Sequence, residues 1–304
     1  MTEPKIINFM GQRKIAAVFS LLLVIASIYS LSTRGMVFGL DFTGGTQIEV
    51  GYEQSVNLEV IRGQLSSAGF SNAVVVYFGT ETDVLIKMQG EPESDLADKV
   101  VQALGQDQSI DLRRVDYVGP QVGEELRDEG GLGMLAALLV VMMYVAIRFQ
   151  YKFSIGAVVA LAHDVIITLG LFSLLGLEFD LTVLAAVLAV VGYSLNDTII
   201  VFDRIRENFR LLRKADSVSV VNESLTQTLD RTLMTSFTTL LVLFTLFVVG
   251  GELIHNFAIA LLFGIIIGTY SSIYIASNIL LGMNTSREDL VPQVREDEEF
   301  DGLP

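Results

Sequence analysis

The stretch VVGYSLNDTIIVF, residues 190–202, places an amide and a carboxylate, Asn196 and Asp197, in the middle of an apolar run. An ionised Asp at bilayer depth costs at least about 2.5 kcal/mol, so such residues normally face the interior of a helix bundle and are functional by default. The stretch therefore predicts a membrane helix whose inner face carries a polar function.

The composition agrees with a membrane protein. The chain of 304 residues is 51% hydrophobic and has a mean hydropathy of +0.54, which is more apolar than ordinary soluble domains. It contains no cysteine and two histidines, so we expect neither a disulfide framework nor a metal site. Its net charge of −15 argues against a nucleic-acid partner, because phosphate backbones require a cationic surface.

Six apolar runs each approach the roughly 20 residues that cross a hydrocarbon layer about 30 Å thick. The first run is too long for a signal peptide and has no A-x-A cleavage site, so we expect it to be a retained anchor. The six predicted spans are residues 15–31, 132–147, 153–177, 181–202, 233–249 and 257–281.

The short loops indicate an orientation, because Lys and Arg accumulate on the cytoplasmic side of a membrane. The connections 178–180 and 250–256 contain no Lys or Arg. We therefore predict that both termini, segments 1–14 and 283–304, lie in the cytoplasm and that the acidic end REDEEFDGLP is solvated. The residues that mark the predicted cytoplasmic side are Lys5, Arg13, Lys14, Arg148, Lys152, Arg204, Arg206, Arg210, Arg213 and Lys214.

Segment 32–131 is then a large extracytoplasmic domain. Its residues alternate between strand and helix patterns, with strands in TQIEVGY, NAVVVYF, DVLIKMQ and IDLRRVDYV and helices in NLEVIRGQLSSAG and SDLADKVVQAL. The order βαββαβ predicts a ferredoxin-like α+β domain. It shows no catalytic constellation, so we interpret it as a binding or lever module.

The fold class that follows is a polytopic α-helical membrane protein. A five-helix membrane bundle occupies 132–282, and the α+β domain is inserted between the first two spans. Segment 204–232 includes an amphipathic stretch, SVSVVNESLTQTLDR, with apolar residues at helical spacing. It predicts either a helix along the cytoplasmic interface or an ordinary packed amphipathic helix.

Two carboxylates lie at membrane depth. Asp197 is six residues from Asp203 at the basic edge, or about 9 Å into the membrane by helical rise. Asp164, in ALAHDVIIT, is eleven residues from Phe153, or about 16 Å deep by the same rise. Burial favours the neutral form of a carboxylate and a nearby cation favours the ionised form. Both residues are therefore candidate protonation sites.

Arg231 is the candidate cation. It lies at the foot of the fifth span, and Thr235, Thr238 and Thr245 follow it at i+4, i+7 and i+14, which is one face of a helix. We expect this stripe to point inward, so that Arg231 pairs with ionised Asp197 and is released when Asp197 is protonated.

Simpler interpretations remain open for these residues. The two carboxylates can act as a static polar clamp between helices, and Arg231 can extend to the interface. His163 can relay protons or only accept and donate structural hydrogen bonds. Asn196 does not titrate, so we expect it to donate a hydrogen bond between helices, and Thr198 to support the same site. A second feature, Gly264 and Gly268 in a G-x-x-x-G pattern, predicts close helix packing.

The source of energy is constrained by motifs. The chain has no G-x-x-x-x-G-K-[ST] loop and no Rossmann fingerprint, so we expect no ATP hydrolysis, no enzymatic site and no cofactor. An ion gradient remains. One charge moved through 100 mV is worth about 2.3 kcal/mol, which shifts a two-state equilibrium nearly fifty-fold.

Five stretches together resemble the SecF proteins of the SecD/SecF family, in the RND superfamily. They lie in the family's order and at its spacing over nearly the whole chain. The stretches are GLDFTGGTQIEV (39–50), VDYVGPQVGEEL (115–126), ALAHDVIITLGLFSLLG (160–176), VVGYSLNDTIIVFDRIREN (190–208) and TLDRTLMTSFTTLL (228–241).

The resemblance implies a function in protein export. SecF proteins pair with SecD, often bridged by YajC, dock on the SecYEG translocon, and use the proton motive force to help move preproteins out on the periplasmic side. A location in the bacterial inner membrane, in contact with membrane lipid, is implied as well. Their membrane carboxylate and arginine match Asp197 and Arg231 here, while the role of Asp164 rests on its depth. Because the SecD half is absent, we expect the proton path to be shared with another chain.

The stretch LDFTGG, residues 40–45, resembles the signature at which the periplasmic domain of this family joins the membrane. It contains Asp41, and Gly44 and Gly45 serve either as a hinge or as a tight turn. Two rival functions remain: half of an RND-type secondary transporter for a small solute or lipid, and a scaffold for the translocon that uses no energy.

Overall fold

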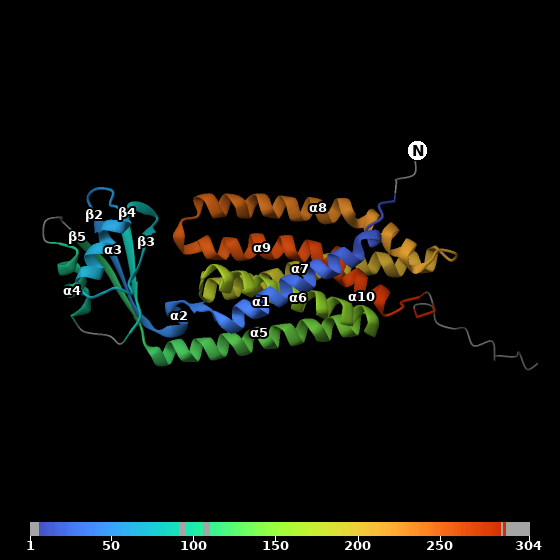
Figure 1. Ribbon diagram of the computed structural model, residues 1–304, viewed down its shortest axis with the longest axis horizontal. Coiled ribbons are helices and arrows are strands. Elements are labelled where there is room, and N and C mark those ends of the chain that lie inside the picture. Colours follow the sequence, from blue (N-terminus) through green and yellow to red (C-terminus); the bar gives the residue numbers. More distant parts are fainter. Residues whose placement is uncertain (1–5, 91–94, 106–109, 287, 290–304) are drawn as a thin grey trace, which may run out of the picture.

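The computed structural model describes residues 6–90, 95–105, 110–286 and 288–289. Within them, six helical segments are long and apolar enough to cross a membrane, and they run side by side with an α+β domain beyond one end of the bundle (Figure 1). This arrangement confirms the predicted fold class. The six segments are Met10–Thr33, Pro120–Arg148, Tyr151–Leu175, Leu181–Leu211, Ser217–Val249 and Glu252–Gly282.

Each of these segments is built around one long helix. In the last of them, a π-helical turn, Ser272–Ala276, separates α9 from α10 without ending the helix. Short 3-10 turns, Met10–Gln12 and Glu252–Ile254, precede α1 and α9. The helices are α1 (Arg13–Thr33), α5 (Pro120–Arg148), α6 (Tyr151–Leu175), α7 (Leu181–Leu211), α8 (Ser217–Val249), α9 (His255–Ser271) and α10 (Ser277–Gly282).

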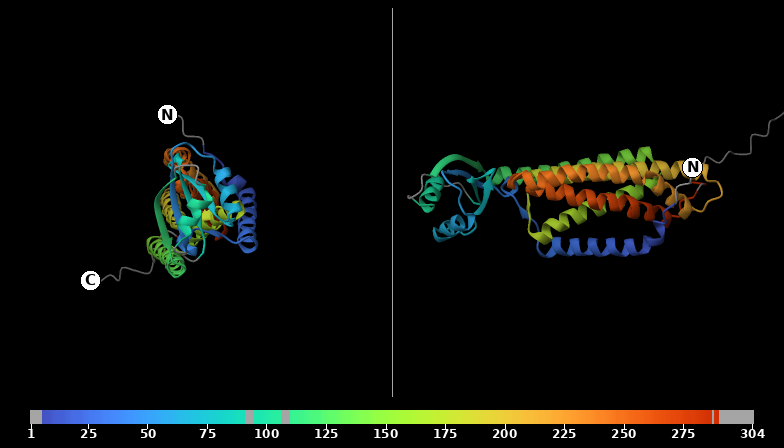
Figure 2. Two further views of the ribbon diagram at one scale, coloured as in Figure 1. Left: turned by 90° about the vertical axis from the view of Figure 1, so that its left-hand side faces the viewer. Right: turned by 90° about the horizontal axis from the view of Figure 1, so that it is seen from above.

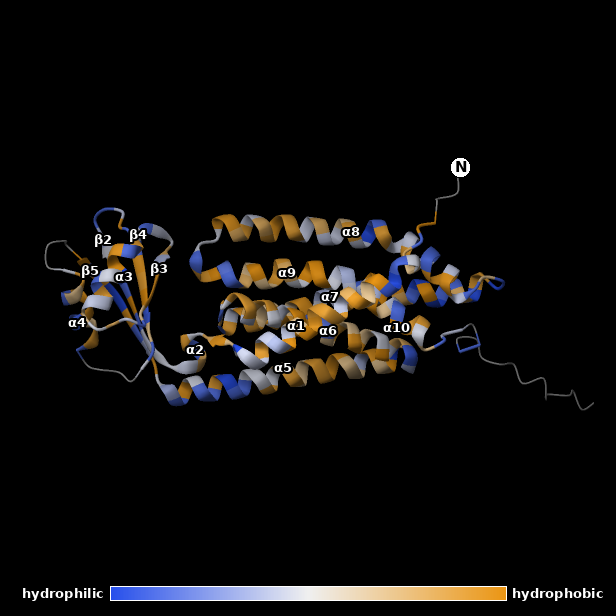
Figure 3. Cartoon of the chain, in the orientation of Figure 1, coloured by the Kyte–Doolittle hydropathy of each residue, from blue (hydrophilic) through white to orange (hydrophobic). Residues whose placement is uncertain are grey.

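The centre of the bundle is formed by α6, α7 and α9. In the most apolar stretch of α6, 56% of the residues are buried, against 6% in α5 and 17% in α8. Figure 3 shows that most of α8 and the part of α5 away from the α+β domain are nevertheless hydrophobic, and Figure 2 shows α1 at the edge of the bundle. The outer helices therefore present apolar faces to lipid or to a partner protein.

Small residues bring α9 close to α7, as the G-x-x-x-G pattern predicts. A Cβ atom on Gly264 would overlap the side chain of Val190, and one on Gly268 would lie 3.0 Å from the Cβ atom of Ser194. On the far side of α6, Gly170 packs equally closely against Ser27 of α1. The close approach permits side-chain hydrogen bonds between helices.

The α+β domain has the predicted βαββαβ order. It contains an antiparallel sheet ordered β3-β4-β2-β5, the order of a ferredoxin-like domain. Apolar residues of the sheet and of both helices, among them Ile48, Leu65 and Val100, form its separate core. The elements are β2 (Gly45–Tyr52), α3 (Leu58–Ser67), β3 (Val74–Phe78), β4 (Thr80–Met88), α4 (Leu96–Ala103) and β5 (Ile110–Val118).

A short joint connects this domain to the bundle. Strand β1 (Val37–Phe38), which follows α1, pairs in parallel with β6 (Glu178–Phe179), which precedes α7. The single helical turn α2 (Leu40–Thr43) then leads into β2. From the domain side, Lys87 of β4 pairs with Glu178 at 3.1 Å. The beginning of α7 is therefore held directly by the α+β domain.

Two boundaries differ from the predicted segments. Helix α5 begins at Pro120, whose fixed φ suits a first helical position, so the helix extends well into predicted segment 32–131. Segment 204–232 is not a separate interfacial element, because its first residues end α7 and its last residues begin the continuous helix α8. Val220, Val221 and Leu225 are buried inside the protein, so the packed interpretation of this amphipathic stretch is correct. The acidic end 295–304 lies outside the described residues.

The glycine contacts predict opposite effects for two matched substitutions. Gly264→Ala forces a methyl group into Val190, and overpacking of this kind costs about 1–3 kcal/mol. Gly192→Ala meets no atom within 4 Å and gains up to about 1 kcal/mol of helix propensity. We expect thermal unfolding in detergent, followed by circular dichroism, to occur at a lower temperature for the first variant and at an unchanged or higher one for the second. Equal unfolding temperatures for the two variants would contradict the assigned α7–α9 contact.

Candidate functional site

Asp164, near the middle of α6, joins the three central helices. Its carboxylate is completely buried, and Oδ2 accepts hydrogen bonds from Ser194 of α7 at 2.6 Å and from Ser271 of α9 at 2.7 Å. Oδ1 lies 2.9 Å from Nδ1 of His163. Burial of a carboxylate is tolerated when donors surround it, and the hydroxyl groups supply that environment. Asp164 therefore has the geometry of a polar clamp.

His163 contacts the other carboxylate oxygen of Asp164. The side chain is 6% exposed, Nδ1 faces Asp164, and Nε2 is buried without a hydrogen-bond partner among the described residues. Its ring lies 6.4 Å from the ring of Tyr270. The contact with Asp164 fits the structural interpretation of His163, and the unpartnered nitrogen is the atom through which a relay would have to pass.

Asp197, near the middle of α7, is in a different state. The side chain is 1% exposed, yet Oδ2 is buried and has no hydrogen-bond partner among the described residues. An unpartnered buried polar atom is costly, and this cost is much larger for an ionised carboxylate than for a neutral one. The two membrane carboxylates thus differ sharply: Asp164 is surrounded by donors and Asp197 is not.

Thr198 lies next to Asp197 and contacts the irregular part of the last helix. Its hydroxyl group is 2.9 Å from that of Ser272, which also donates to the carbonyl oxygen of Ser194 at 3.3 Å. Ser272 is the first residue of the π-helical turn, and such turns often mark functional sites in helices. Thr198 therefore links α7 to the last membrane segment, and its role in supporting the site stays a prediction.

Arg231 and the threonine stripe do not point into the bundle of this chain, contrary to our expectation. Arg231, Thr235, Thr238 and Thr245 are exposed, and the three hydroxyl groups donate to carbonyl oxygens of α8 itself. The stripe is turned outward because α8 packs through another face, which includes Thr232, Ser236 and Leu243. The prediction of an inward stripe was wrong for the chain on its own.

Arg231 is exposed, whereas Asp197 is buried. No ion pair of Arg231 is formed within the part of the chain that the structure describes. The predicted Asp197–Arg231 latch is therefore not closed in the chain on its own, and it stays a prediction.

Asn196 does not form the predicted hydrogen bond between helices. It is exposed on α7, and the described residues provide no partner for its amide. Asn196 and Arg231 are thus polar groups at bundle depth that face away from the protein. Within the described residues, no group of three or more His, Asp or Glu side chains could hold a metal ion.

The sequence analysis missed the hydroxyl groups that organise the site. Ser194 had not been singled out, and Ser271 and Ser272 had not been connected with the carboxylates. A further bond, between Ser236 of α8 and Thr269 of α9 at 2.8 Å, extends the polar layer to α8. The spacing of these serines could have identified them. Ser194 lies on the same helix face as Asp197, and Ser271 and Ser272 lie on the same face as Gly264 and Gly268.

The joint at residues 40–45 is tightly packed. Gly44 and Gly45 have φ values of 72° and 144°, which favour glycine. A Cβ on Gly44 would lie 2.7 Å from Cα of Pro120, and one on Gly45 would overlap the carbonyl oxygen of Met88. This geometry supports the tight turn over the hinge. Asp41 has a specific contact too, because Oδ2 accepts a hydrogen bond of 3.2 Å from the amide of Leu181, the first residue of α7.

The contrast between the two carboxylates predicts different effects of the same substitution. Asp164→Asn replaces an acceptor by a donor and leaves a buried hydroxyl or imidazole without its partner, at a cost of about 1–3 kcal/mol. Asp197→Asn removes a carboxyl group that has an unpartnered oxygen, so its effect on stability is smaller. We expect Asp164→Asn to lower the unfolding temperature in detergent and Asp197→Asn to leave it within a few degrees. Greater destabilisation by Asp197→Asn would show that Asp197 is the structural clamp.

Comparisons with known proteins agree with this architecture. The model of a family described as "Protein export membrane protein SecD/SecF, C-terminal" matches residues 97–286, and the "SecD/SecF GG Motif" matches residues 29–56. The protein translocase subunit SecF of Vibrio alginolyticus is 50% identical, over 99% of this chain and 98% of the relative. The corresponding subunit of Pseudomonas aeruginosa is 54% identical over 96% of each chain.

A solved structure is similar over most of the chain. The crystal structure of SecDF, a translocon-associated membrane protein from Thermus thermophilus, superimposes with a TM-score of 0.82 at 38% sequence identity. The match covers 93% of this chain and 39% of the longer SecDF chain. This multi-pass membrane protein belongs to the SecD/SecF family of protein export membrane proteins, and its relatives are SecF subunits.

Proposed function

We propose that this chain is the SecF subunit of a SecDF complex that uses the proton motive force to drive preprotein translocation. The complex would act on the periplasmic side of SecYEG. The observation that carries this proposal is Asp197, a carboxyl group in the middle of a membrane helix that is buried and unpartnered at Oδ2 among the described residues. A carboxyl group in this setting gains or loses a proton at low structural cost, whereas Asp164 is fixed by its donors.

A SecD partner explains why polar residues face outward. Arg231, Thr235 and Asn196 would be exposed to lipid in the isolated chain, and an arginine in that position costs about 2.5–3.5 kcal/mol or more. A second membrane bundle packed on α7 and α8 would cover them and could supply an acceptor for Arg231. The match to only 39% of the SecDF chain agrees with a partner that contributes the remaining membrane helices. The proton path would then run between the two subunits.

The joint offers a route from Asp197 to the α+β domain. Helix α7 is continuous from Leu181 to Leu211, so a shift near Asp197 reaches its first residues. The amide of Leu181 donates a hydrogen bond to Asp41, and β6, which directly precedes α7, pairs with β1. The Lys87–Glu178 pair extends the connection to β4. Protonation of Asp197 would therefore change the position of the α+β domain as a rigid body.

The π-helical turn Ser272–Ala276 gives the bundle a place to adjust. Each hydrogen bond of a π-helical turn spans one residue more than that of an α-helix. Conversion of this turn to α-helix would therefore shift the rest of the segment without unfolding it. Ser272 touches Thr198, directly beside Asp197. We infer that this contact transmits the ionisation state of Asp197 to the last membrane segment.

The positive-inside rule supports an orientation with both termini in the cytoplasm of a bacterium and the α+β domain in the periplasm. In this orientation the α+β domain would meet preproteins that leave SecYEG. YajC would associate with the assembled complex in the same inner membrane. Lipid would contact the apolar outer faces of α5 and α1. The family relationship favours protein export over transport of a small solute.

Substitutions that remove the switch should separate energy coupling from assembly. We expect Asp197→Asn and Arg231→Met each to abolish the gradient-dependent part of preprotein export, a loss of at least about tenfold. The neutral amide cannot titrate and the thioether cannot respond to the carboxylate. Export would be measured in membrane vesicles that contain SecD and SecYEG, with and without a proton gradient, and complex assembly by copurification with SecD.

The matched controls are Asp98→Asn, on the exposed surface of α4, and Arg213→Met, in the exposed turn after α7. Both carry the same chemical change and should leave gradient-dependent export intact. Normal gradient-dependent export by Asp197→Asn and Arg231→Met would instead support a scaffold that uses no energy. Loss of solute flux, with export unchanged, would support a transporter.

A further inference from the structure

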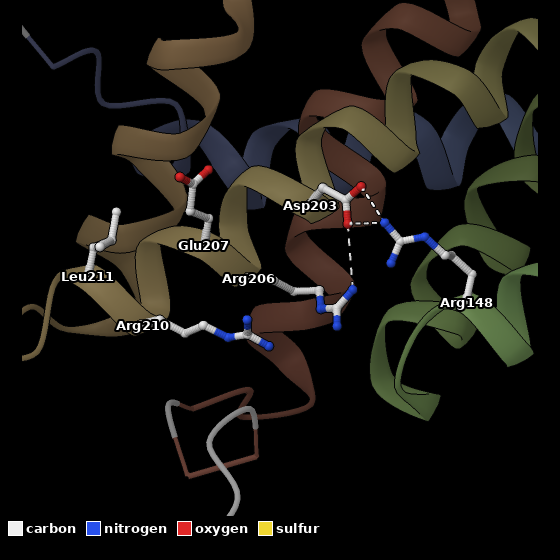
Figure 4. A pocket seen from close by; sticks show the side chains of 6 residues that line it. All are labelled: Arg148, Asp203, Arg206, Glu207, Arg210 and Leu211. Atoms are coloured by element: carbon white, nitrogen blue, oxygen red, sulfur yellow. Dashed lines mark hydrogen bonds and ion pairs between the residues drawn. The ribbon is translucent and has the colours of Figure 1, made fainter.

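Three arginines surround a cavity at the end of the bundle that lies away from the α+β domain. The cavity has a volume of about 370 Å³ and is lined by residues from the end of α5 and the end of α7 (Figure 4). The lining residues are Arg148, Asp203, Arg206, Glu207, Arg210 and Leu211. This cluster is separate from Asp197 and takes no part in the proposed proton path.

The arginines are only partly neutralised. Asp203 pairs with Arg148 at 2.9 Å and with Arg206 at 3.5 Å, so one carboxylate serves two guanidinium groups. Glu207 is turned to Arg204, with which it pairs at 2.7 Å. Arg210 forms no ion pair within the described residues and is exposed. The cavity therefore has donors available for an anion.

An aromatic ring fixes two of these guanidinium groups. The guanidinium carbon of Arg148 is 5.0 Å from the centre of the Phe149 ring, and that of Arg206 is 5.4 Å from the same centre. Cation–π contacts at this distance hold a charged group in place without neutralising it. The two arginines are consequently ordered before any ligand binds, which reduces the entropic cost of binding.

Apolar residues close to the lining residues in the sequence are exposed. Leu211, which lines the cavity, is 66% exposed, and Ile147 and Tyr151, on either side of Arg148 in the sequence, are 81% and 66% exposed. Large exposed side chains next to arginines are typical of the boundary between a hydrocarbon layer and its headgroups. A free phosphate would use only the arginines, whereas a phospholipid would also place its acyl chains against these residues.

We propose that this cavity binds the phosphate group of an anionic phospholipid from the leaflet on that side of the membrane. The guanidinium groups of Arg206 and Arg210 donate to the phosphate oxygens in the geometry that arginine favours, and Arg148 remains with Asp203. Basic pockets between membrane helices at this depth select anionic headgroups. The bound lipid would join the ends of α5 and α7.

The test is native mass spectrometry of the full chain in detergent, with added phosphatidylglycerol or phosphatidylcholine. We expect the wild type to retain phosphatidylglycerol at least about fivefold more than phosphatidylcholine. Arg206→Gln with Arg210→Gln should lose that preference, by roughly tenfold or more in affinity for two charges. Arg210→Gln alone should lose part of it, and this variant tests the site without risk to folding because Arg210 is exposed and unpaired among the described residues.

The matched control is Arg213→Gln with Lys214→Gln, which removes the same charge from the neighbouring exposed turn. It should keep the wild-type preference. An equal loss in the control, or no preference in the wild type, would overturn the proposal. A third arm adds millimolar inorganic phosphate: retention of the lipid supports the phospholipid as the source of the phosphate group, and displacement of the lipid would assign the cavity to a free anion.

Discussion

The membrane bundle depends on the buried carboxylate of Asp164, which accepts hydrogen bonds from hydroxyl groups of two other helices. Ser194 and Ser271 reach it because glycines allow α9 to lie close to α7. A hydrogen bond between membrane helices contributes only about 1 kcal/mol to stability. Here two such bonds end on one buried acid, and loss of either would leave a buried polar group without its partner. This clamp sets the register of α6, α7 and α9, and with it the position of every other group in the site.

The way in which α6, α7 and α9 are aligned also determines which groups surround Asp197. Asp197 lies about one turn beyond Ser194 on α7, whose hydroxyl group donates to Asp164. Thr198 beside it bonds to Ser272, and Oδ2 of Asp197 has no partner among the described residues. Two carboxylates in one bundle therefore have different surroundings: Asp164 is bonded to two other helices, whereas Oδ2 of Asp197 has no partner among the described residues. Under the proposed function, Asp197 is the one that changes its ionisation state. Under the proposed function, Arg231, on the outward face of α8, would face the partner subunit.

Much of the fold could be predicted from the sequence, because apolar runs and alternating patterns are local signals. The six spans and all six elements of the ferredoxin-like domain were recognised in this way. Asp164 and Asp197 were found because a charge inside an apolar run is rare. The direction of the Arg231 stripe was not predictable, since i, i+4 and i+7 spacing defines a face of a helix but not its neighbour. Nonlocal contacts were missed as well: the Asp41–Leu181 bond joins residues far apart in the chain, and serine is too common in membrane helices to identify Ser194.

Difference infrared spectroscopy of the reconstituted complex tests most directly whether Asp197 is the group that titrates. A proton-switched Asp197 gives the carbonyl stretching band of a neutral carboxyl group that appears on acidification and disappears on alkalinisation. The band should be absent in Asp197→Asn and retained in Asp164→Asn. A band that is unchanged across the same pH range, or one that persists in Asp197→Asn, would contradict a switch at this residue.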